Sequence, residues 1–491
     1  PVPPGFTLST SLCSDYLKAK SLSVVLKNNI KKNISKTEGV IGKMFGGSNP
    51  LLLSVRSGAP VSMPGMMETI LNIGLTSKTI PHMIKMSKNE GFVYDSYRRL
   101  IMMYADVVME KALGLNKSTQ SIRELMEKEL ESVKKYKGYK NDSNMKAKDW
   151  KALSNKYLGM VEKEFGVPFP DDHYEQLYGA IAAVFESWNG KRAKEYRSFE
   201  KISSSMGTAV NVQAMVFGNL GKDCGTGVAF TRNPSTGENI FFGEWLPNAQ
   251  GEDVVAGIRT PHPVAGNSKN SLSVAMPEAF KELDGVRKKL ENHFDDMQDI
   301  EFTIQEKKLW MLQTRRGKRT GIAAIKIATD MVKEKLITKE VAVSRVRPHQ
   351  IYESLLKNID PKDVENNLPI SLGLPAGPGA SCGIAVFTAE RAEELGKKNK
   401  KVILVREETS PEDIHGMHYS EGILTSRGGL TSHAALVARG WGKSCVVGCQ
   451  DLTIDKSHTF AKIGDKKIKE GDHITLNGSS GDIYLGKMRL F

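Results

Sequence analysis

The sequence contains no apolar run that approaches the ~18 residues of a membrane-spanning helix. We therefore expect a soluble protein with no membrane partner. The chain starts at Pro1, and the segment that follows has neither the charged nor the apolar region of a signal peptide, so we do not expect secretion. An initiator methionine is also missing, and we expect the chain to be part of a longer one.

Cysteine and aromatic residues are scarce. The 491 residues include five cysteines, and none belongs to a paired C-x-x-C array of the kind that binds zinc. We expect free thiols in a reducing compartment. Aromatic residues make up 7% of the chain, and no basic run is interleaved with them. The patterns by which proteins bind nucleic acid are therefore missing, and we expect no nucleic-acid partner.

Basic residues outnumber acidic residues by 69 to 56, which gives a formal net charge of +13. A balance of this size fits either a polyanionic partner or a Lys-rich solvated surface. The lysines are spread along the chain, which favours the surface. Hydrophobic residues, at 40%, suffice for packed cores, and the length indicates about three domains.

Apolar residues recur at helical spacing in three regions, 92–136, 150–200 and 322–358. Between the second and the third region, strand-like runs at 209–217 and 228–231 flank a glycine-rich loop. The pattern of apolar residues thus predicts both helical and strand-rich parts of the chain.

A segment dense in Gly and Pro, 371–383, marks a domain boundary, and short β-runs alternate with brief helices beyond it. We expect a multidomain chain of the α/β and α+β classes. Its parts are a front domain at 1–320 with a helical insertion at about 80–200, a helical connector at 321–370 and a compact α/β domain at 371–491.

The sharpest functional signal is TSRGGLTSHAALVARGWGKS at 425–444. Two glycines permit a tight turn after a strand, and a hydroxyl residue can cap the helix that follows. His433 then lies in the first helical turn, where unpaired N–H groups and the helix dipole stabilise negative charge. A neutral imidazole placed there can accept a phosphoryl group. The alternative is a capped helix with a partly buried histidine. The predicted supporting residues are Gly428, Gly429, Thr431 and Ser432.

This segment resembles the phosphohistidine segment of the pyruvate, phosphate dikinase family, whose pattern is close to G-G-M-T-S-H-A-A-V-V-A-R-G-M-G-K. Leu430 stands here in place of the pattern's methionine. Other stretches resemble this family rather than phosphoenolpyruvate synthase or enzyme I of the sugar phosphotransferase system. They are LLSVRSGAPVSMPGMMETILNIGL (52–75), VQAMVFGNLGKDCGTGVAFTRNPSTGE (212–238), NAQGEDVVAGIRTP (248–261) and MQDIEFTIQEKKLWMLQTRRGKRT (297–320).

In the last of these stretches, two strand-like runs flank a polar turn at Glu306–Lys308. If Gln305 pairs with Leu309, antiparallel pairing sets Glu301 opposite Gln313 and Asp299 opposite Arg315. One face would then carry two carboxylates, an amide and a guanidinium, a suitable floor for magnesium and a triphosphate. A slip of one residue would scatter them. The alternative is an ordinary exposed hairpin with cross-strand charge pairs.

The resemblance implies an ATP-grasp architecture for the front domain, with nucleotide and metal bound at matching positions of this hairpin. It implies Mg²⁺ as the cofactor, with Glu301 and Gln313 as its ligands. Arg56, in SVRSG, would add a planar fork for phosphate oxygens. The predicted ATP- and phosphate-binding residues are Arg56, Thr231, Asp299, Glu301, Gln313 and Arg315.

The family converts ATP, phosphate and pyruvate to AMP, diphosphate and phosphoenolpyruvate. The resemblance implies that His433 accepts a pyrophosphoryl group from ATP, passes the terminal phosphoryl group to phosphate and offers the other to pyruvate. The domain at 371–491 would be a swivelling phosphohistidine domain. We expect the full-length protein to be a homodimer in the cytoplasm or in an organelle, with plastid and glycosome both open.

Two parts of the family's pattern have no counterpart in this sequence. One is a glycine-rich stretch with an ATP-contacting lysine, and the other is the C-terminal barrel that binds phosphoenolpyruvate and pyruvate. We therefore expect this chain alone to lack the complete reaction, and its oligomeric state, including a monomer, stays open. The alternatives are a phosphoenolpyruvate synthase-like dikinase that uses water and a non-catalytic binding protein with the same fold.

Overall fold

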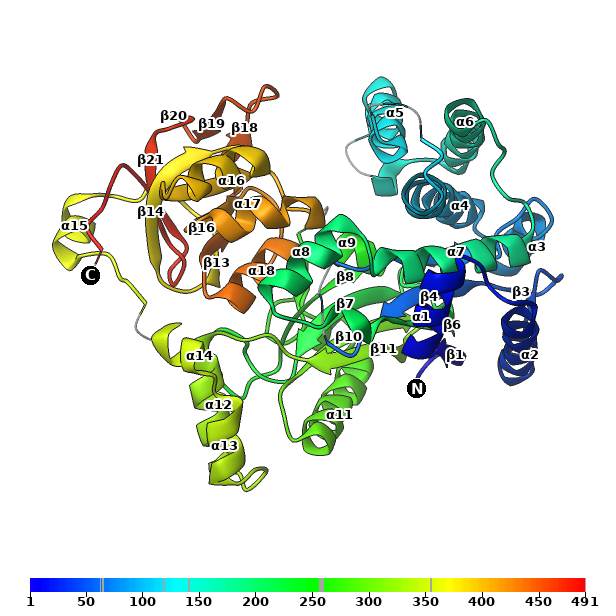
Figure 1. The fold of residues 1–491 in the computed structure, drawn as a ribbon, viewed down its shortest axis with the longest axis horizontal. Helices are drawn as coiled ribbons and strands as arrows, with labels where there is room; N and C mark the ends of the chain where they lie inside the picture. The colour runs from blue at the N-terminus through cyan, green and yellow to red at the C-terminus, as the bar shows by residue number, and fades with distance from the viewer. Residues whose placement is uncertain are drawn as a thin grey trace. The chain divides into compact units, whose positions relative to one another are not determined.

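The computed structural model describes residues 1–490 apart from 62, 64, 65, 117, 119, 140, 141, 256–259, 354 and 355. The segments at 52–75 and 248–261, which carry part of the resemblance, thus lie partly outside the described residues. The chain divides into two compact units, Val2–Val216 and Phe217–Phe491, with Pro1 in the second (Figure 1).

The first unit contains a four-stranded antiparallel sheet. Burial alternates along its inner strand β6 (Ala209–Ala214), the pattern of a strand with one covered face. Helices α1 (Thr10–Ala19) and α7 (His173–Ser187) pack against β6. The order of the sheet is β1 (Gly5–Leu8), β6, β4 (Leu53–Gly58) and β5 (Thr69–Ile73), and a separate short pair is formed by β2 (Met44–Phe45) and β3 (Pro50–Leu51).

Most of the chain between β5 and β6 is helical. Helix α4 (Glu90–Tyr104) is capped by Asn89, whose side chain accepts a hydrogen bond from the Phe92 N–H, and the helix continues into a π-helix at Ala105–Ala112. Its Leu100 and Ile101 are fully buried. The other α-helices among the described residues of this unit are α2 (Val24–Ile41), α3 (Ile80–Ser87), α5 (Ile122–Lys137), α6 (Ala147–Phe165) and α8 (Lys191–Phe199).

The second unit begins with a five-stranded antiparallel sheet. Its order is β11 (Lys308–Arg316), β10 (Gln298–Gln305), β7 (Gly225–Phe230), β8 (Phe242–Pro247) and β9 (His262–Pro263). Helix α11 (Pro277–Phe294) covers one face, where Leu283 joins a core with Ile300, Phe302 and Ile304 (Figure 1). Because successive side chains of a strand alternate between faces, Asp299 and Glu301 point away from α11.

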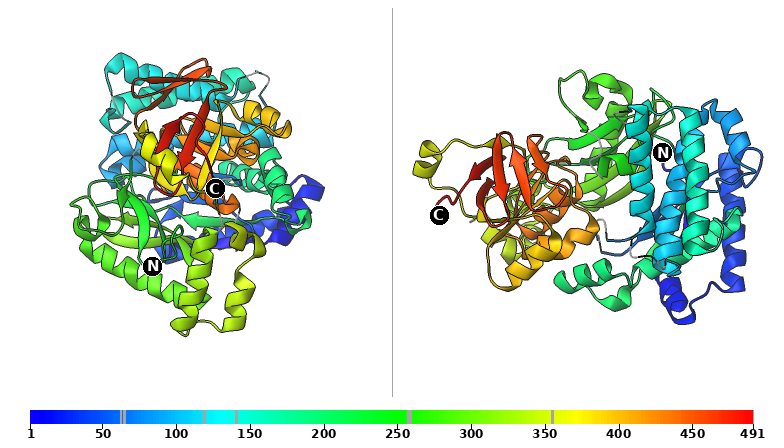
Figure 2. Two further views of the ribbon diagram at one scale, coloured as in Figure 1. Left: turned by 90° about the vertical axis from the view of Figure 1, so that its left-hand side faces the viewer. Right: turned by 90° about the horizontal axis from the view of Figure 1, so that it is seen from above.

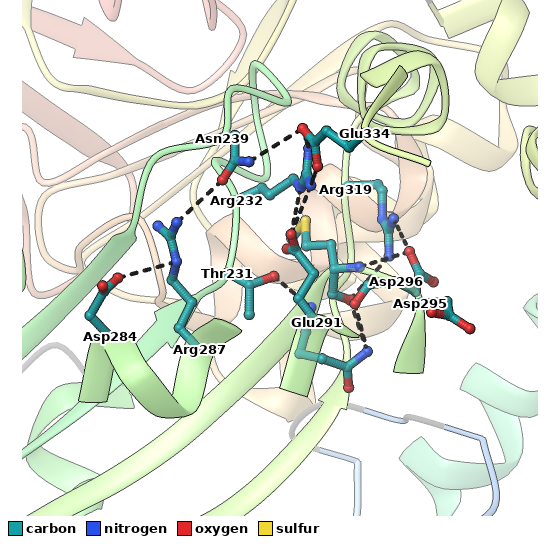
Figure 3. A network of polar contacts seen from close by, with 12 residues as sticks. Thr231, Arg232, Asn239, Asp284, Arg287, Glu291, Asp295, Asp296, Arg319 and Glu334 are labelled. Carbon is teal, nitrogen blue, oxygen red and sulfur yellow. Dashed lines mark hydrogen bonds and ion pairs between the residues drawn. The ribbon is translucent and has the colours of Figure 1, made fainter. Parts of the chain in front are cut away.

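The segment expected to be a connector begins with α12 (Gly321–Lys333), α13 (Lys339–Arg345) and α14 (Pro348–Glu353). Ile327 of α12 packs with Phe230 of β7. A buried ion network also joins these elements: Arg232, just after β7, donates hydrogen bonds to Glu291 of α11 and to Glu334 at the end of α12 (Figure 3). Helix α12 is thus fixed to the end of β7 by both apolar and ionic contacts.

The C-terminal part of this unit contains an eight-stranded mixed sheet. Four parallel strands form its centre in chain order, β14 (Ala380–Val386), β15 (Val402–Arg406), β16 (Gly422–Thr425) and β17 (Ser444–Val447). The intervening helices α16 (Ala389–Lys397), α17 (Ile414–Tyr419) and α18 (His433–Trp441) lie together on one face (Figure 1, Figure 2). When each parallel strand lies beside the one before it in the chain, always on the same side, right-handed crossovers place all the connecting helices on one face of the sheet.

The other face of this sheet is covered by a three-stranded sheet of β18 (Leu452–Ile454), β19 (Phe460–Ile463) and β20 (Lys466–Lys469). Coverage on both faces explains why the run VILV of β15 is apolar without alternation. No helix of the described residues is both long and apolar enough to cross a bilayer. The remaining strands of the large sheet are β12 (Ser371–Leu372), β13 (Leu374–Gly377), β21 (His473–Asn477) and β22 (Asp482–Leu485).

The ion network around Arg232 predicts a large loss of stability on its removal. Arg232→Leu should lower the free energy of unfolding by about 3 kcal/mol, because Glu291 becomes a buried carboxylate that has lost its cation. Urea unfolding followed by circular dichroism measures the change. Lys288, which pairs with Asp284 while its side chain is 66% exposed, is the control. Lys288→Ala should cost less than about 0.5 kcal/mol, and equal losses in the two variants would contradict the prediction.

Candidate active site

The register of β10 and β11 brings four of the predicted ligands onto one face of the sheet. Glu301 lies opposite Gln313, and Asp299 lies opposite Arg315, so the expected pairing is confirmed for both pairs. Directly opposed side chains share a face, as do those at i and i+2 along a strand. Since Ile300 belongs to the core against α11, the four ligands lie on the face that α11 leaves uncovered.

The tip of the hairpin differs from the expectation. Gln305 pairs with Lys308 rather than with Leu309, and the turn is the two-residue segment 306–307, in which both residues have positive φ. This backbone is typical of the tightest hairpin turns. A β-bulge directly after Glu301 then shifts the register by one residue. The two differences compensate, and for this reason the predicted pairs still oppose each other.

Arg315 joins the two carboxylates of this face. Its Nη2 donates a hydrogen bond to Glu301 Oε1 at 2.7 Å and lies 3.2 Å from Asp299 Oδ2. Burial raises the pKa of Asp299 above its ordinary value; the Arg315 guanidinium opposes this shift and the Glu301 carboxylate adds to it. Among the described residues, Asp299 Oδ1 and Arg315 Nε are buried and have no hydrogen-bond partner. Because buried polar atoms are nearly always bonded, these two atoms point to a ligand.

The donor set of this face fits a magnesium ion together with a polyphosphate. Mg²⁺ in such sites is usually bound by one or two carboxylates, and phosphate oxygens complete its coordination. Asp299 and Glu301 supply carboxylate oxygens here, and Gln313 adds an amide. In the part of the chain that the structure describes, no group of three or more His, Cys, Asp or Glu side chains could hold an ion. Phosphate oxygens would therefore be needed to complete the site.

Two predicted phosphate ligands, Thr231 and Arg56, lie outside the hairpin. Thr231 is fully buried directly after β7, and its hydroxyl accepts a hydrogen bond from the Gln298 N–H at 3.0 Å (Figure 3). This bond ties the end of β7 to the start of β10. Arg56 is a residue of β4 in the first unit, opposite Asn211 of β6. Phosphate binding by Thr231 and by Arg56 stays a prediction.

His433 is the first residue of α18, in the first helical turn as predicted. Ser432 is the N-cap, but its side chain does not cap the helix: within the described residues, Ser432 Oγ is buried and has no hydrogen-bond partner. Gly428 has a φ of +100°, which favours glycine, and a Cβ there would lie 3.0 Å from the Ser432 side chain. The loop therefore presents a buried hydroxyl at a helix N-terminus, an arrangement suited to an anion.

The buried guanidinium of Arg439 holds the loop before α18. Its Nη2 donates a hydrogen bond to the carbonyl of Leu430 at 2.5 Å, and its Nη1 donates one to the carbonyl of Ala376 at 3.3 Å. Burial lowers the pKa of Arg439 to about 10. Arg427, the other nearby arginine, is exposed and lies 3.7 Å from Glu407. Arg439 thus shapes the loop backbone, whereas Arg427 lies at the surface.

Glu244 of β8 is a further residue of this region, and sequence reasoning missed it. Val228 of β7 lies opposite Glu301 on one side and opposite Glu244 on the other, so Glu244 shares the face of the predicted ligands. Its Oε1 accepts a hydrogen bond from the Leu430 N–H at 3.1 Å. Its Oε2 accepts hydrogen bonds from the Thr431 N–H at 3.3 Å and the Thr431 hydroxyl at 2.7 Å. The available signal was the run FGEWLP at 242–247, which forms β8.

Two family models match the chain. The model described as "Pyruvate phosphate dikinase, AMP/ATP-binding domain" matches residues 19–276 and 263–336. The chain belongs to the pyruvate phosphate dikinase family. The model described as "PEP-utilising enzyme, mobile domain" matches residues 398–481, which include His433. The chain is thus a mixed α/β multidomain member of the family with an ATP-binding domain and a mobile phosphohistidine domain.

Several curated dikinases are similar along the whole chain. Pyruvate, phosphate dikinase of Rhizobium meliloti is 49% identical over 500 residues, which cover 99% of this chain and 54% of the relative. The chloroplastic pyruvate, phosphate dikinase 1 of Arabidopsis thaliana is 49% identical over 492 residues, 100% of this chain and 49% of the relative. The enzyme of Entamoeba histolytica is 48% identical over 494 residues, 100% and 54% respectively. The chain spans about half the length of these relatives.

The raised pKa of Asp299 predicts that metal-dependent nucleotide binding weakens early on acidification. A raised pKa means that the carboxyl takes up its proton at a higher pH, and a protonated carboxyl is a poor metal ligand. Calorimetric titration with Mg²⁺ and a non-hydrolysable ATP analogue, from neutral pH down to the ordinary pKa of an aspartate, about 3.9, measures the effect. Asp299→Asn should bind weakly and lose the part of the pH dependence due to this carboxyl. A wild-type affinity that does not fall over this range would contradict the prediction.

Proposed function

We propose that this chain carries the nucleotide-binding and phosphohistidine steps of a pyruvate, phosphate dikinase. ATP donates a pyrophosphoryl group to His433, the terminal phosphoryl group passes to inorganic phosphate, and the remaining phosphohistidine serves pyruvate at a site outside this chain. One observation carries the proposal. His433 starts α18 beside the hydroxyl of Ser432, which is buried and has no hydrogen-bond partner in the described parts of the chain.

The N-terminus of α18 supports a bound phosphoryl group electrostatically. The first N–H groups of a helix have no partner within it and carry the positive end of the dipole. The Ser432 hydroxyl is able to donate a hydrogen bond to a phosphoryl oxygen. The contact of the Glu244 carboxylate with the N–H groups of Leu430 and Thr431 agrees with this, because an anion already binds to the backbone at this loop.

The face of β10 and β11 supports binding of the triphosphate in an ATP-grasp architecture. Arg315 offers a guanidinium fork whose Nε has no partner among the described residues, and Asp299, Glu301 and Gln313 offer oxygen ligands for Mg²⁺. When bound, Mg²⁺ neutralises charge on the polyphosphate. Arg56 and Thr231 are further candidates to bind phosphate. Positioning and charge neutralisation supply most of the catalysis in phosphoryl transfer, and the residues of this face suit both.

The first chemical step joins a ring nitrogen of His433 to the β-phosphorus of ATP. The bond between this phosphorus and the oxygen that bridges to the α-phosphorus breaks, and AMP leaves with the electron pair. In the second step an oxygen of inorganic phosphate attacks the terminal phosphorus. The bond from that phosphorus to the bridging oxygen breaks, so diphosphate leaves, and the bridging oxygen stays with its electron pair on the phosphoryl group of His433. Neither step requires a general base, because the attacking ring nitrogen of a neutral imidazole and the attacking oxygen of ionised phosphate carry no proton.

Two alternatives differ in chemistry from the dikinase. A phosphoenolpyruvate synthase-like enzyme would use water in place of phosphate, and a non-catalytic relative would keep the fold without the reaction. The names of the similar curated proteins support the dikinase. The presence of Asp299, Glu301 and Arg315 on one face favours a catalytic chain over a non-catalytic relative, because these side chains suit metal and phosphate binding. The homodimer and the cytoplasmic or organellar location stay predictions.

The proposal predicts a covalent intermediate on His433. In the protein extended to the length of its relatives, ATP labelled in the γ-phosphate should leave an acid-labile, alkali-stable label on the chain. His433→Asn should remove it. Arg315→Leu should slow labelling by about a hundredfold or more, because one charged contact to the transferring group is lost. Arg316→Leu, on the same strand but with a side chain that is 72% exposed, is the control and should label normally. Label on the His433→Asn protein would overturn the assignment.

The proposal also predicts which half of the reaction this chain lacks. The 491-residue chain alone should form no phosphoenolpyruvate from ATP, phosphate and pyruvate, because a phosphohistidine by itself has no group that orients pyruvate or stabilises its enolate. A coupled assay for phosphoenolpyruvate tests this. Formation of product at the rate of a full-length dikinase would mean that the pyruvate site lies within these residues.

A further inference from the structure

The loop after β15 and the loop before α18 meet at one edge of the large sheet. β15 and β16 are parallel neighbours, with Arg406 opposite Thr425, so both strands end at the same edge. The pairing extends into the loops: the Ser426 N–H donates to the Arg406 carbonyl at 3.2 Å, and the Arg427 N–H donates to the Glu407 carbonyl at 2.8 Å. The residues that follow in the two loops, 407–410 and 426–432, are therefore held side by side.

This arrangement brings a hydroxyl to the ring of His433. Thr409 Oγ1 lies 3.1 Å from His433 Nδ1, within hydrogen-bond distance. The loop that carries Thr409 is fixed at the next residue, because the N–H and the hydroxyl of Ser410 both donate to Asp413, at 2.8 Å and 3.2 Å. Asp413 is buried and lies 3.4 Å from the Arg406 guanidinium. Thr409 thus lies in a loop that hydrogen bonds hold in place at the next residue, Ser410.

We propose that Thr409 is a positioning residue that sets the tautomer of His433, an inference that rests on the proposed function. In a neutral imidazole one nitrogen carries the proton and the other a lone pair, and the hydrogen bond to one nitrogen decides which is which. When the Thr409 hydroxyl accepts a hydrogen bond from Nδ1–H, the lone pair is on Nε2. The attacking nitrogen is therefore Nε2. If the hydroxyl donated to Nδ1 instead, the proton would be on Nε2 and the lone pair of Nδ1 would be engaged.

The same contact serves the transfer step. Nε2 forms the bond to phosphorus as the bond from phosphorus to the leaving oxygen breaks, while Nδ1 keeps its proton throughout. The ring gains positive charge as the N–P bond forms, which strengthens the hydrogen bond from Nδ1–H to Thr409 Oγ1. A hydrogen bond that strengthens as the reaction proceeds accelerates the chemical step and leaves nucleotide binding unchanged.

The tautomer is measured on the 491-residue chain without any turnover. Nitrogen-15 NMR of selectively labelled histidine, at a pH where the ring is neutral, distinguishes Nδ1–H from Nε2–H, and His433→Asn identifies the signal. We expect Nδ1–H in the wild type and in Thr409→Ser, which keeps the hydroxyl, and a shift toward Nε2–H in Thr409→Val. Thr453→Val, an exposed change of the same kind in β18, is the control and should not alter the signal. An Nε2–H tautomer in the wild type, or an unchanged tautomer in Thr409→Val, would overturn the proposal.

The consequence for the reaction is measured in the protein extended to the length of its relatives. Thr409→Val should slow labelling of His433 from ATP by about tenfold, the usual worth of one neutral hydrogen bond, with an unchanged KM for ATP. Thr409→Ser should restore the rate. A wild-type protein that takes no label, yet has the Nδ1–H tautomer, would refute the phosphohistidine function while the hydrogen bond stands. Equal labelling rates in the wild type and Thr409→Val would refute the role of Thr409 while the function stands.

Discussion

The antiparallel register between β10 and β11 is the constraint on which the proposed nucleotide-binding face depends. The core against α11 takes up Ile300 and its neighbours, so Asp299 and Glu301 must point to the other face. The bulge after Glu301 compensates for the two-residue turn at the tip and keeps the partners on β11 in place. Burial then changes the chemistry of this face. It raises the pKa of Asp299 and leaves one of its oxygens without a partner in the described chain, a state that a metal and phosphates would relieve.

In the phosphohistidine domain a different constraint applies: neighbouring parallel strands end at the same edge of the sheet. Loops that follow β15 and β16 must meet at that edge, and the ring of His433 receives its hydroxyl neighbour from one loop and its helix N-terminus from the other. The buried Arg439 fixes the backbone between them. Each of these contributions comes from residues of this domain itself, so the proposed motion of His433 between sites would leave its immediate surroundings intact.

Much of this site was predictable from the sequence, for physical reasons that differ between its parts. The position of His433 follows from glycines and a helix pattern that are adjacent in the chain, although the expected side-chain cap is not formed by Ser432. The register of the hairpin follows from the period of two residues in a strand, although the tip was wrong by one residue because a bulge leaves no simple mark. Glu244 and Thr409 could not be found in this way. Each comes to the site by pairing between separate strands. The run FGEWLP marks the strand that carries Glu244, but sequence spacing does not show which strand it pairs with.

The proposed function requires attack by His433 at the β-phosphorus of ATP bound on the face of Glu301 and Arg315. ATP with heavy oxygen in the bridge between the α- and β-phosphorus tests this, in the protein extended to the length of its relatives and without inorganic phosphate or pyruvate. Reversible attack at the β-phosphorus frees AMP, whose phosphate oxygens rotate, so the heavy oxygen should move from the bridge to a non-bridging position in the wild type. It should stay in the bridge in His433→Asn and in Arg315→Leu. Scrambling that persists in His433→Asn, or an intact bridge in a wild-type protein that still takes up label from ATP, would contradict the account.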